Sequence, residues 1–230
     1  MKKLIMSDKY KCFCDELSKE GYEIIHTDTV SVFHQPEQKH ADMQCLRIGE
    51  KYFILNECEG LKHSIQSFNP TVISQRAGKS YPQNILLNCL YLNNVLYGKL
   101  SAVADEVKEY CCRNNIKSVN VNQGYARCST LVVSKNSVIT ADNSIKKALE
   151  SNGAEVLKIR EGHIALEGYN YGFIGGASGR IDNKIIFFGN IQNHPDFDII
   201  KAFINKHNKD IQIICPQMPL TDIGGIVTKV

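Results

Sequence analysis

The chain has 230 residues, of which 43% are hydrophobic and 22% charged, so it can bury a sizeable core and does not have the composition of a disordered polypeptide. Its formal net charge of +3 is far from the basic excess of a nucleic-acid-binding domain. No apolar run approaches the roughly 20 residues of a membrane-spanning helix, and the apolar stretch near the N-terminus is too short for a signal peptide. We therefore expect a cytoplasmic protein without a membrane or nucleic-acid partner.

Five segments have the apolar spacing of amphipathic helices, and they recur along the whole chain. They are Ser7–Glu20, Glu59–Phe68, Ser101–Asn114, Asp142–Asn152 and His194–His207. Polar residues at their starts predict N-caps at Ser7, Ser101, Asp142 and the 193–196 turn. Gly21 and Gly153 stand where glycines commonly close helices, so they support two of the C-terminal boundaries.

A short β-rich run follows each helix, and a second apolar stretch follows that run. The first runs are Tyr22–Val30, Thr71–Ser74, Ser118–Val121, Glu155–Ile159 and Ile211–Cys215. The second stretches are His40–Ile48, Asn84–Leu92, Ala126–Ser134, Tyr169–Gly176 and Leu220–Val227. A further strand is predicted after four of them, at Lys51–Leu55, Val95–Gly98, Ser137–Thr140 and Ile185–Gly189. The repeating unit is therefore a helix followed by three strands, with a period of about 45 residues.

The repeat predicts one α/β domain over residues 1–230, built as a five-bladed propeller. The last unit lacks its third strand, and Lys3–Met6 is a strand without a unit, so pairing Lys3–Met6 with Gly225–Val230 would close the ring. Closure removes the exposed sheet edges that an open array would leave. The alternative is an ordinary three-layer α/β domain, but a doubly wound sheet has one strand per helix rather than two or three.

Nine cysteines form an odd-numbered set spread along the chain, which is a poor disulfide framework and fits a reducing compartment. The close pairs Cys12/Cys14 and Cys111/Cys112 have the wrong internal spacing for a zinc site, so no metal is predicted. Most of these thiols are expected to be small buried hydrophobic groups.

Four short stretches carry a resemblance to a known family. They are His40-Ala41-Asp42-Met43, Asn88-Cys89-Leu90-Tyr91-Leu92-Asn93, Gly124-Tyr125-Ala126-Arg127-Cys128-Ser129 and Leu166-Glu167-Gly168-Tyr169-Asn170. All four resemble motifs of the pentein, or guanidine-modifying enzyme, superfamily. The first resembles its His-x-Asp motif, and the second the strand between its His and Cys blades. The third resembles the approach to its nucleophilic cysteine, and the fourth its Leu-(Asp/Glu)-Gly-Gly-Asp turn. The overall likeness is greatest to an uncharacterised group of bacterial pentein-like proteins.

The resemblance implies a five-fold pseudosymmetric α/β-propeller with an active site at the centre of the ring. In the familiar enzymes the cysteine blade comes last, whereas here about a hundred residues follow Cys128. The cyclic order of the motifs is kept, so the chain resembles a circular permutant. Asn170 stands where the better-known enzymes usually have an aspartate.

By this resemblance Cys128 is the candidate nucleophile, His40 the general acid and base, and Asp42 a carboxylate that holds the substrate or orients the imidazole. Such chemistry needs a thiolate, a proton donor for the departing amine, and carboxylates for a cationic substrate. We expect Arg127 to favour the thiolate, and Asp42 to share a strand face with His40. The alternatives are a buried core thiol at Cys128 and a surface histidine at His40.

Asp222, Glu167 and Asn170 are the candidate substrate-binding residues, and ordinary turn chemistry is the alternative for the two acids. At least two of Asp42, Asp222 and Glu167 should line the central cavity. The glycine-rich stretch from Gly175 to Arg180 lacks the lysine and the following helix of a phosphate-binding loop, so we interpret it as a tight loop between two strands.

Two hypotheses for function follow. One is a hydrolase of the deiminase or dimethylaminohydrolase type, which acts without a cofactor on a small guanidino or amidino compound. The other is a non-catalytic pentein that works as a binding module, as the ribosome anti-association translation factor does, and in that case the absence of a nucleic-acid partner would not hold.

Overall fold

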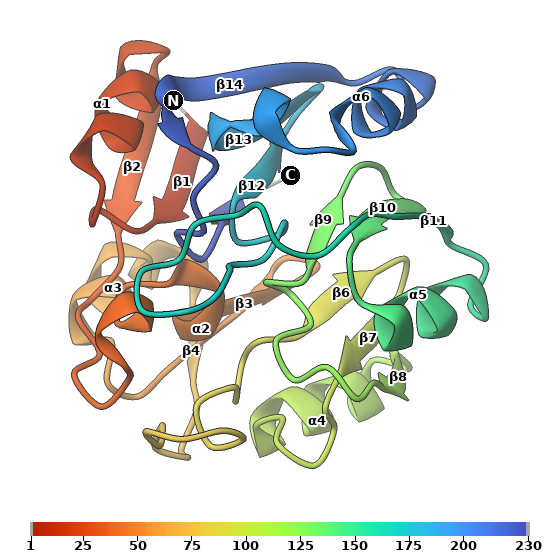
Figure 1. Cartoon of the computed structure of the whole chain (residues 1–230). Coiled ribbons are helices and arrows are strands. Elements are labelled where there is room, and N and C mark those ends of the chain that lie inside the picture. Colours follow the sequence, from red (N-terminus) through yellow and green to blue (C-terminus); the bar gives the residue numbers. More distant parts are fainter. Residues whose placement is uncertain (1, 229–230) are drawn as a thin grey trace.

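The computed structural model describes residues 2–228, and the chain forms five small three-stranded sheets arranged around a central axis (Figure 1). In each sheet an inner strand pairs antiparallel with a middle strand, and a helix then crosses to an outer strand parallel to the middle one. The inner strands contact one another around the axis, for example β12 against β9 and β15. The predicted five-bladed α/β-propeller is therefore confirmed.

The blades are numbered here in chain order, and their elements are as follows. Blade 1 holds β15 (Ile226–Thr228), β1 (Lys2–Met6), α1 (Lys11–Lys19) and β2 (Tyr22–His26). Blade 2 holds β3 (Cys45–Ile48), β4 (Lys51–Ile54), α3 (Glu59–Ser64), η2 (Gln66–Phe68) and β5 (Thr71–Val72). Blade 3 holds β6 (Leu90–Leu92), β7 (Val95–Gly98), α4 (Asp105–Arg113) and β8 (Lys117–Asn120). Blade 4 holds β9 (Thr130–Val132), β10 (Ser137–Thr140), α5 (Asn143–Glu150) and β11 (Glu155–Lys158). Blade 5 holds β12 (Ser178–Ile181), β13 (Lys184–Asn190), η3 (Ile191–Asn193), α6 (Phe197–Lys206) and β14 (Asp210–Pro219).

The two ends of the chain meet in blade 1, as the repeat predicted. Strand β15 pairs antiparallel with β1, and Leu4 stands opposite Thr228 while Met6 stands opposite Ile226. Residues 229–230, which the prediction also included, lie outside the described residues. The pairing gives β1 a partner on each edge, because β2 occupies its other side.

The helix boundaries differ from the predicted ones mainly at the N-termini. Helix α5 begins after Asp142, whose side chain accepts a hydrogen bond from the Ile145 N–H, so this predicted cap is confirmed. Ser7 and Ser101 do not cap, because α1 begins only after Tyr10 and α4 only after Ala104. The Ser7 hydroxyl instead accepts a hydrogen bond from the nearby Lys9 N–H, a local turn that competes with helix formation.

The predicted apolar strand at 169–176 is wrong: this segment is a series of turns, and the strand is β12, from Ser178 to Ile181. Gly175 and Gly176 in this segment are glycines because other parts of the chain lie too close for a Cβ atom. A Cβ on Gly175 would lie 2.4 Å from the Thr130 carbonyl oxygen, and one on Gly176 would lie 1.9 Å from Asp222 Oδ1. The stretch from Gly175 to Arg180 is thus not a loop between strands, since its second half is β12 itself.

Four clusters of buried apolar side chains fill the spaces between the sheets and their helices. All nine cysteines are free, and seven of them are buried, which confirms that most act as small hydrophobic groups. Within residues 2–228, no helix is both long and apolar enough to span a bilayer.

Candidate active site

His40 and Asp42 lie on the short connection that leads into the inner strand of blade 2. The prediction that both lie on a strand is wrong, because His40 is the N-cap residue of the short helix α2 (Ala41–Gln44) and the strand begins at Cys45. Ala41, Met43 and Gln44 favour such a turn more than a strand, and Asp42 suits the first turn of a helix. The Asp42 N–H donates to the Gly224 carbonyl, which ties the turn to blade 1.

Cys128 lies in the turn before β9, and a buried asparagine holds this turn in place. The Asn88 Oδ1 atom accepts hydrogen bonds from the Arg127 N–H at 2.9 Å and the Cys128 N–H at 3.3 Å. The Asn88 amide group also donates to Cys128 Sγ at 3.5 Å. Asn88 is fully buried and lies before β6, so blades 3 and 4 together fix the position of the thiol.

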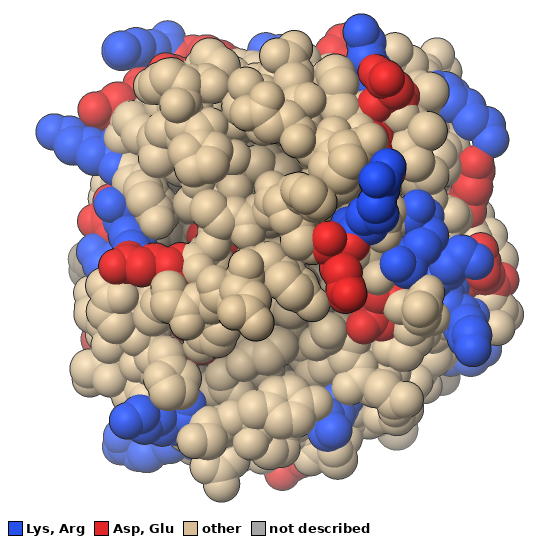
Figure 2. Space-filling model, viewed as in Figure 1, with Lys and Arg blue, Asp and Glu red and all other residues tan. Residues whose placement is uncertain are grey.

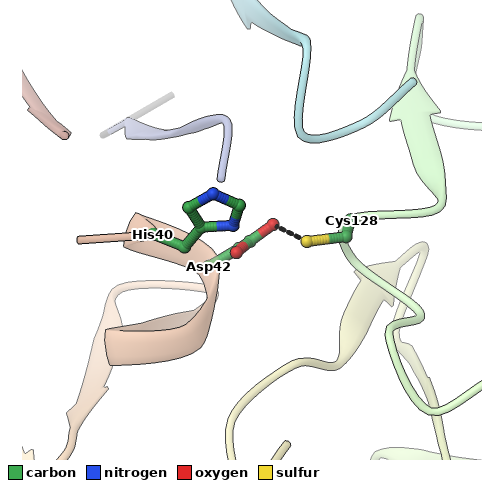
Figure 3. Close-up of side chains that lie close together, drawn as sticks. All are labelled: His40, Asp42 and Cys128. Atoms are coloured by element: carbon green, nitrogen blue, oxygen red, sulfur yellow. Dashed lines mark hydrogen bonds between the residues drawn. The ribbon is translucent and has the colours of Figure 1, made fainter. Parts of the chain in front are cut away.

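Three reactive side chains converge at the centre of the ring (Figure 3). Ligand-type atoms of His40, Asp42 and Cys128 all lie within 4.8 Å of one another. The Cys128 thiol donates a hydrogen bond to Asp42 Oδ2 at 2.6 Å, while Asp42 Oδ1 is buried without a hydrogen-bond partner among the described residues. All three side chains are buried, with residue exposures of 4%, 2% and 3% respectively.

Asp222 brings a second carboxylate to the same centre from the connection before β15. Its Oδ1 atom lies 3.9 Å from His40 Nδ1 and accepts a hydrogen bond from the Gly224 N–H. Its Oδ2 atom accepts a hydrogen bond from the Phe173 N–H at 2.8 Å. Asp222 is buried like the other three, so the structure brings it together with the His40, Asp42 and Cys128 group.

Burial and mutual repulsion set the protonation states of these groups. Burial, followed by the Asp222 charge, raises the pKa of Asp42 to about 8. Burial lowers the pKa of His40, despite the opposing effect of Asp222, so its imidazole is neutral near pH 7. Burial and the charges of Asp42 and Asp222 raise the pKa of the Cys128 thiol well above its usual value. The resting cluster therefore holds a protonated thiol next to carboxyl groups.

The expectation that Arg127 favours the thiolate is wrong for this resting state. Its guanidinium donates to the carbonyl oxygens of Thr130 at 3.1 Å and Ile226 at 3.3 Å, beside strands β9 and β15. The guanidinium lowers the pKa of Asp42, but less than burial raises it, and the thiol pKa is raised.

A third acid near the cluster was not singled out in the sequence. Glu37, 5% exposed, lies in the turn η1 (Gln35–Glu37) just before His40, and its charge acts on the pKa of both His40 and Asp42. Its Oε1 atom accepts a hydrogen bond from the Tyr169 hydroxyl at 2.6 Å. The only sequence clue was its place in the polar run immediately before the His-x-Asp motif.

Tyrosines and a long loop form the cover of this centre. Tyr169 belongs to the loop of residues 160–177, which crosses the near side of the ring in Figure 1. The Tyr125 hydroxyl accepts a hydrogen bond from the Asn84 amide at 2.8 Å, and that amide also lies 3.5 Å from Glu37 Oε2. On the face shown in Figure 2, most of the middle is uncharged and the charged side chains lie mainly toward the rim, with one mixed acidic and basic group right of the centre.

Glu167 and Asn170 are exposed on the cover and lie outside the buried group. Glu167 pairs with Lys9 at 3.1 Å, and its side chain is 64% exposed. Both residues line an outer cavity of about 460 Å³ together with Tyr169. Of the three acids expected at the central cavity, the structure thus places Asp42 and Asp222 at the centre and Glu167 at the surface.

The same three side chains also form the one group in residues 2–228 with the proximity required of a metal site. Imidazole, carboxylate and thiolate are all zinc ligands, but binding would require the thiol to lose its proton. Assays of the site should therefore include a chelator.

Gly224 is the position where the backbone most directly supports His40. Its φ is +77°, and an added Cβ would lie 2.4 Å from His40 Cα. We expect Gly224→Ala to cost about 1–3 kcal/mol of stability and to displace His40, because both the conformation and the space require glycine. Gly153→Ala is the matched control, since Gly153 also has a positive φ but has no atom within 4 Å of an added Cβ. Thermal unfolding and ligand titration should show instability in both variants but loss of binding only in Gly224→Ala; equal binding by both would contradict a role in placing His40.

Comparisons with known proteins place this geometry in a family. The chain belongs to the family described as "Family of unknown function (DUF6873)", whose model matches residues 4–227. No curated protein matches the sequence. The fold is shared with solved structures of enzymes that modify guanidino compounds, which is the fold that the sequence motifs indicated.

Three solved structures illustrate the similarity in fold. A dimethylarginine dimethylaminohydrolase, solved as an adduct with S-methyl-L-thiocitrulline, has 11% identity and a TM-score of 0.61, with 93% of this chain and 92% of that chain covered. Agmatine deiminase from C. jejuni has 11% identity and a TM-score of 0.57, with 99% and 80% covered. SxtG, an amidinotransferase from Microseira wollei in the saxitoxin biosynthetic pathway, has 10% identity and a TM-score of 0.55, with 93% and 88% covered.

Proposed function

We propose that this chain hydrolyses a carbon–nitrogen bond of a small guanidino or amidino compound, with Cys128 as nucleophile and His40 as general acid and base. The observation that carries the proposal is the convergence of a thiol, an imidazole and a carboxylate within 4.8 Å at the centre of the ring. The named enzymes that share the fold act on, or were solved with, compounds of this chemical class, which supports the same choice of substrate.

The charge of the centre supports a cationic substrate. Asp42, Asp222 and Glu37 act together on the pKa values of the cluster, whereas the cationic side chains with an effect there are Arg127 and Lys9. A guanidinium has a planar fork of N–H donors that suits carboxylates. The unpartnered Asp42 Oδ1 atom provides one buried acceptor for such a donor. Binding a cation would compensate the repulsion that raises the pKa values of Asp42 and Cys128.

The proposed chemistry uses the spacing of the cluster. The Cys128 thiol loses its proton to the neutral His40 imidazole, and Sγ attacks the central carbon of the substrate. The imidazole of His40 lies less than 5 Å from Cys128 Sγ. If the central carbon of the substrate sits about 3 Å from Sγ, the leaving nitrogen on that carbon is within hydrogen-bond reach of the imidazole. The His40 imidazolium then protonates the leaving amine, which departs from the tetrahedral intermediate. This leaves a covalent amidino-thioether on Cys128.

The second half of the reaction reverses these roles. His40, now neutral, takes a proton from water as the water oxygen attacks the amidino carbon. The new tetrahedral intermediate collapses to a urea-type product: the carbon–sulfur bond breaks, the hydroxyl proton passes to solvent as the C=O bond forms, and the thiolate recovers its proton from His40. Asp222, 3.9 Å from His40 Nδ1, stabilises the imidazolium form in both halves. In this proposal Glu167 and Asn170, in the outer cavity beside Tyr169, contact the part of the substrate remote from the reacting carbon.

The second candidate is a non-catalytic binding module. The observation that favours it is the closure of the centre: His40, Asp42, Cys128 and Asp222 are each less than 5% exposed, beneath the Tyr169 cover. An enzyme of the proposed kind must open this cover to admit substrate, whereas a binding module can use the outer surface as it stands.

Titration calorimetry in the presence of a chelator distinguishes the two candidates. We expect arginine, agmatine or methylguanidine to bind, and product release to follow for the true substrate class. Methylurea is the matched control, because it has nearly the same shape without the charge, and its affinity should be at least about tenfold lower. If none of the three cations binds, the guanidine hypothesis is wrong and the binding-module function takes its place.

A further inference from the structure

A second cavity lies at the other end of the propeller axis from the candidate active site. The active-site residues precede the inner strands, whereas the later residues of the same strands line this cavity. Its volume is about 310 Å³, and all five inner strands contribute to its wall. The third residue of each of these strands is among the residues that line the cavity: Arg47, Leu92, Val132, Arg180 and Thr228.

Three arginines face this axial cavity, and none of its lining residues within 2–228 is acidic. Arg47 and Arg180 occupy equivalent third positions in β3 and β12, and Arg127 comes from the turn before β9. The remaining wall is largely apolar, with Leu46, Leu90, Leu131 and Ile226 among its members. Positive charge is thus concentrated in a confined space with apolar walls.

Two of the three guanidinium groups are held along the free edge of β15. Arg127 donates to the Ile226 carbonyl oxygen, and Arg47 donates to the Thr228 carbonyl oxygen. Carbonyls two residues apart on a strand point the same way and lie about 7 Å from each other. The carbonyl contacts fix the positions of the two groups and leave the charge of Arg127 without a counterion among the described residues. Arg47 is also paired with Glu50 at 2.8 Å, outside the cavity wall, and its Nε atom is buried with no hydrogen-bond partner in residues 2–228.

Arg180 differs from the other two, because its side chain makes no hydrogen bond or ion pair with any described residue, and only its backbone is paired, in the β12–β13 ladder. The adjacent Gly179 brings β12 close to β15, since a Cβ there would lie 2.2 Å from the Ile226 side chain. Arg180 is therefore held beside the edge that carries the other two arginines. Burial lowers its pKa, as expected for a partly buried cation without a counterion.

We propose that this axial cavity is a binding site for a compact phosphate compound carrying at least two negative charges, such as pyrophosphate or a small phosphorylated metabolite. Three guanidinium groups on the wall of one cavity can supply several of the N–H donors that the acceptor oxygens of such a ligand need. Arg47 already has Glu50 as a counterion, so a monocarboxylate would still leave one of Arg127 and Arg180 uncompensated, whereas a doubly charged ligand would match both. The proposal does not rest on the proposed hydrolase function: Arg180 and Arg47 have no part in that chemistry, and Arg127 is the one arginine of this cavity whose charge also acts on Asp42.

Titration calorimetry of the full chain with pyrophosphate, in 0.15 M NaCl and without divalent metal, tests the proposal. We expect saturable binding by the wild type, at least tenfold weaker binding by Arg180→Gln, and unchanged binding by Lys184→Gln. Lys184 is the matched control because it lies nearby on β13 and its side chain is 45% exposed. Acetate should not compete at the same concentration.

Three outcomes would overturn the proposal: no binding to the wild type, equal weakening in both variants, or undiminished binding by Arg180→Gln. Circular dichroism checks that each variant is folded. If Arg180→Gln fails to fold, Arg180→Lys keeps the charge but loses the bidentate fork, so it should bind pyrophosphate more weakly than the wild type. Equal affinity of Arg180→Lys and the wild type would contradict recognition by the guanidinium.

Discussion

Cys128→Ala should abolish turnover, by about 10⁴-fold or more, because the variant has no sulfur with which to form the covalent intermediate. The fold should survive, since the loss of a buried thiol costs on the order of 1 kcal/mol through its cavity. Labelling by 2-chloroacetamidine offers a direct measurement that needs no substrate. The amidinium is attracted by the buried carboxylates, so in a Cys112→Ser background mass spectrometry should show one adduct, located on Cys128 by peptide mapping, and none when Cys128→Ala is added.

Neutral chloroacetamide is the matched reagent for that experiment. The raised pKa of Cys128 keeps the resting thiol protonated, so chloroacetamide should leave it unmodified at neutral pH. Cys112, the one exposed cysteine of the nine, should react with chloroacetamide and can be removed by Cys112→Ser. Equal labelling of Cys128 by both reagents, or a large fall in melting temperature of Cys128→Ala with unchanged ligand binding, would support a structural thiol instead.

The sequence predicted the architecture well because each repeat carries its own local information. Asp142 caps its helix, and Gly21 and Gly153 both adopt positive φ at helix ends, so three boundaries could be placed from single residues. The unpaired strand at the N-terminus and the missing one at the C-terminus identified the closure of the ring. The strand prediction failed where contacts with distant residues determine the backbone conformation. Gly175 packs against the backbone of blade 4 and Gly176 against the Asp222 side chain, and neither position has room for a Cβ.

The candidate site was only partly predictable, because its electrostatics depend on residues brought together from separate blades. Arg127 adjoins Cys128 in sequence, yet its guanidinium is held by carbonyls of β9 and β15. Asn88, 40 residues away, holds the turn of the thiol. No spacing rule links these residues, so a motif supplies candidate side chains but not their protonation states.

Asp42→Asn should separate function from stability. The substitution keeps the shape of the side chain but removes the charge that we propose for the substrate, so it should weaken binding of a guanidinium ligand by about 2–5 kcal/mol. The same change should stabilise the free protein at neutral and alkaline pH. A carboxyl with a pKa of about 8 in the folded state and an ordinary value in the unfolded state binds more protons when folded, between about pH 4 and pH 8. Wild-type stability therefore falls as pH rises through this window.

The amide that replaces the carboxyl in this variant cannot titrate, so the advantage of the variant should grow by up to about 1.4 kcal/mol per pH unit from pH 4 and level off above pH 8. Urea unfolding of both proteins at several pH values measures this difference in the free energy of unfolding. Asp182→Asn is the control, since this carboxyl is 56% exposed and should give no such trend. A flat difference would mean that Asp42 is ionised in the resting protein. In the wild type, Asp42 is protonated below about pH 8 and must lose this proton when a guanidinium binds. The affinity for the guanidinium should therefore rise with pH up to about pH 8 and be constant at higher pH.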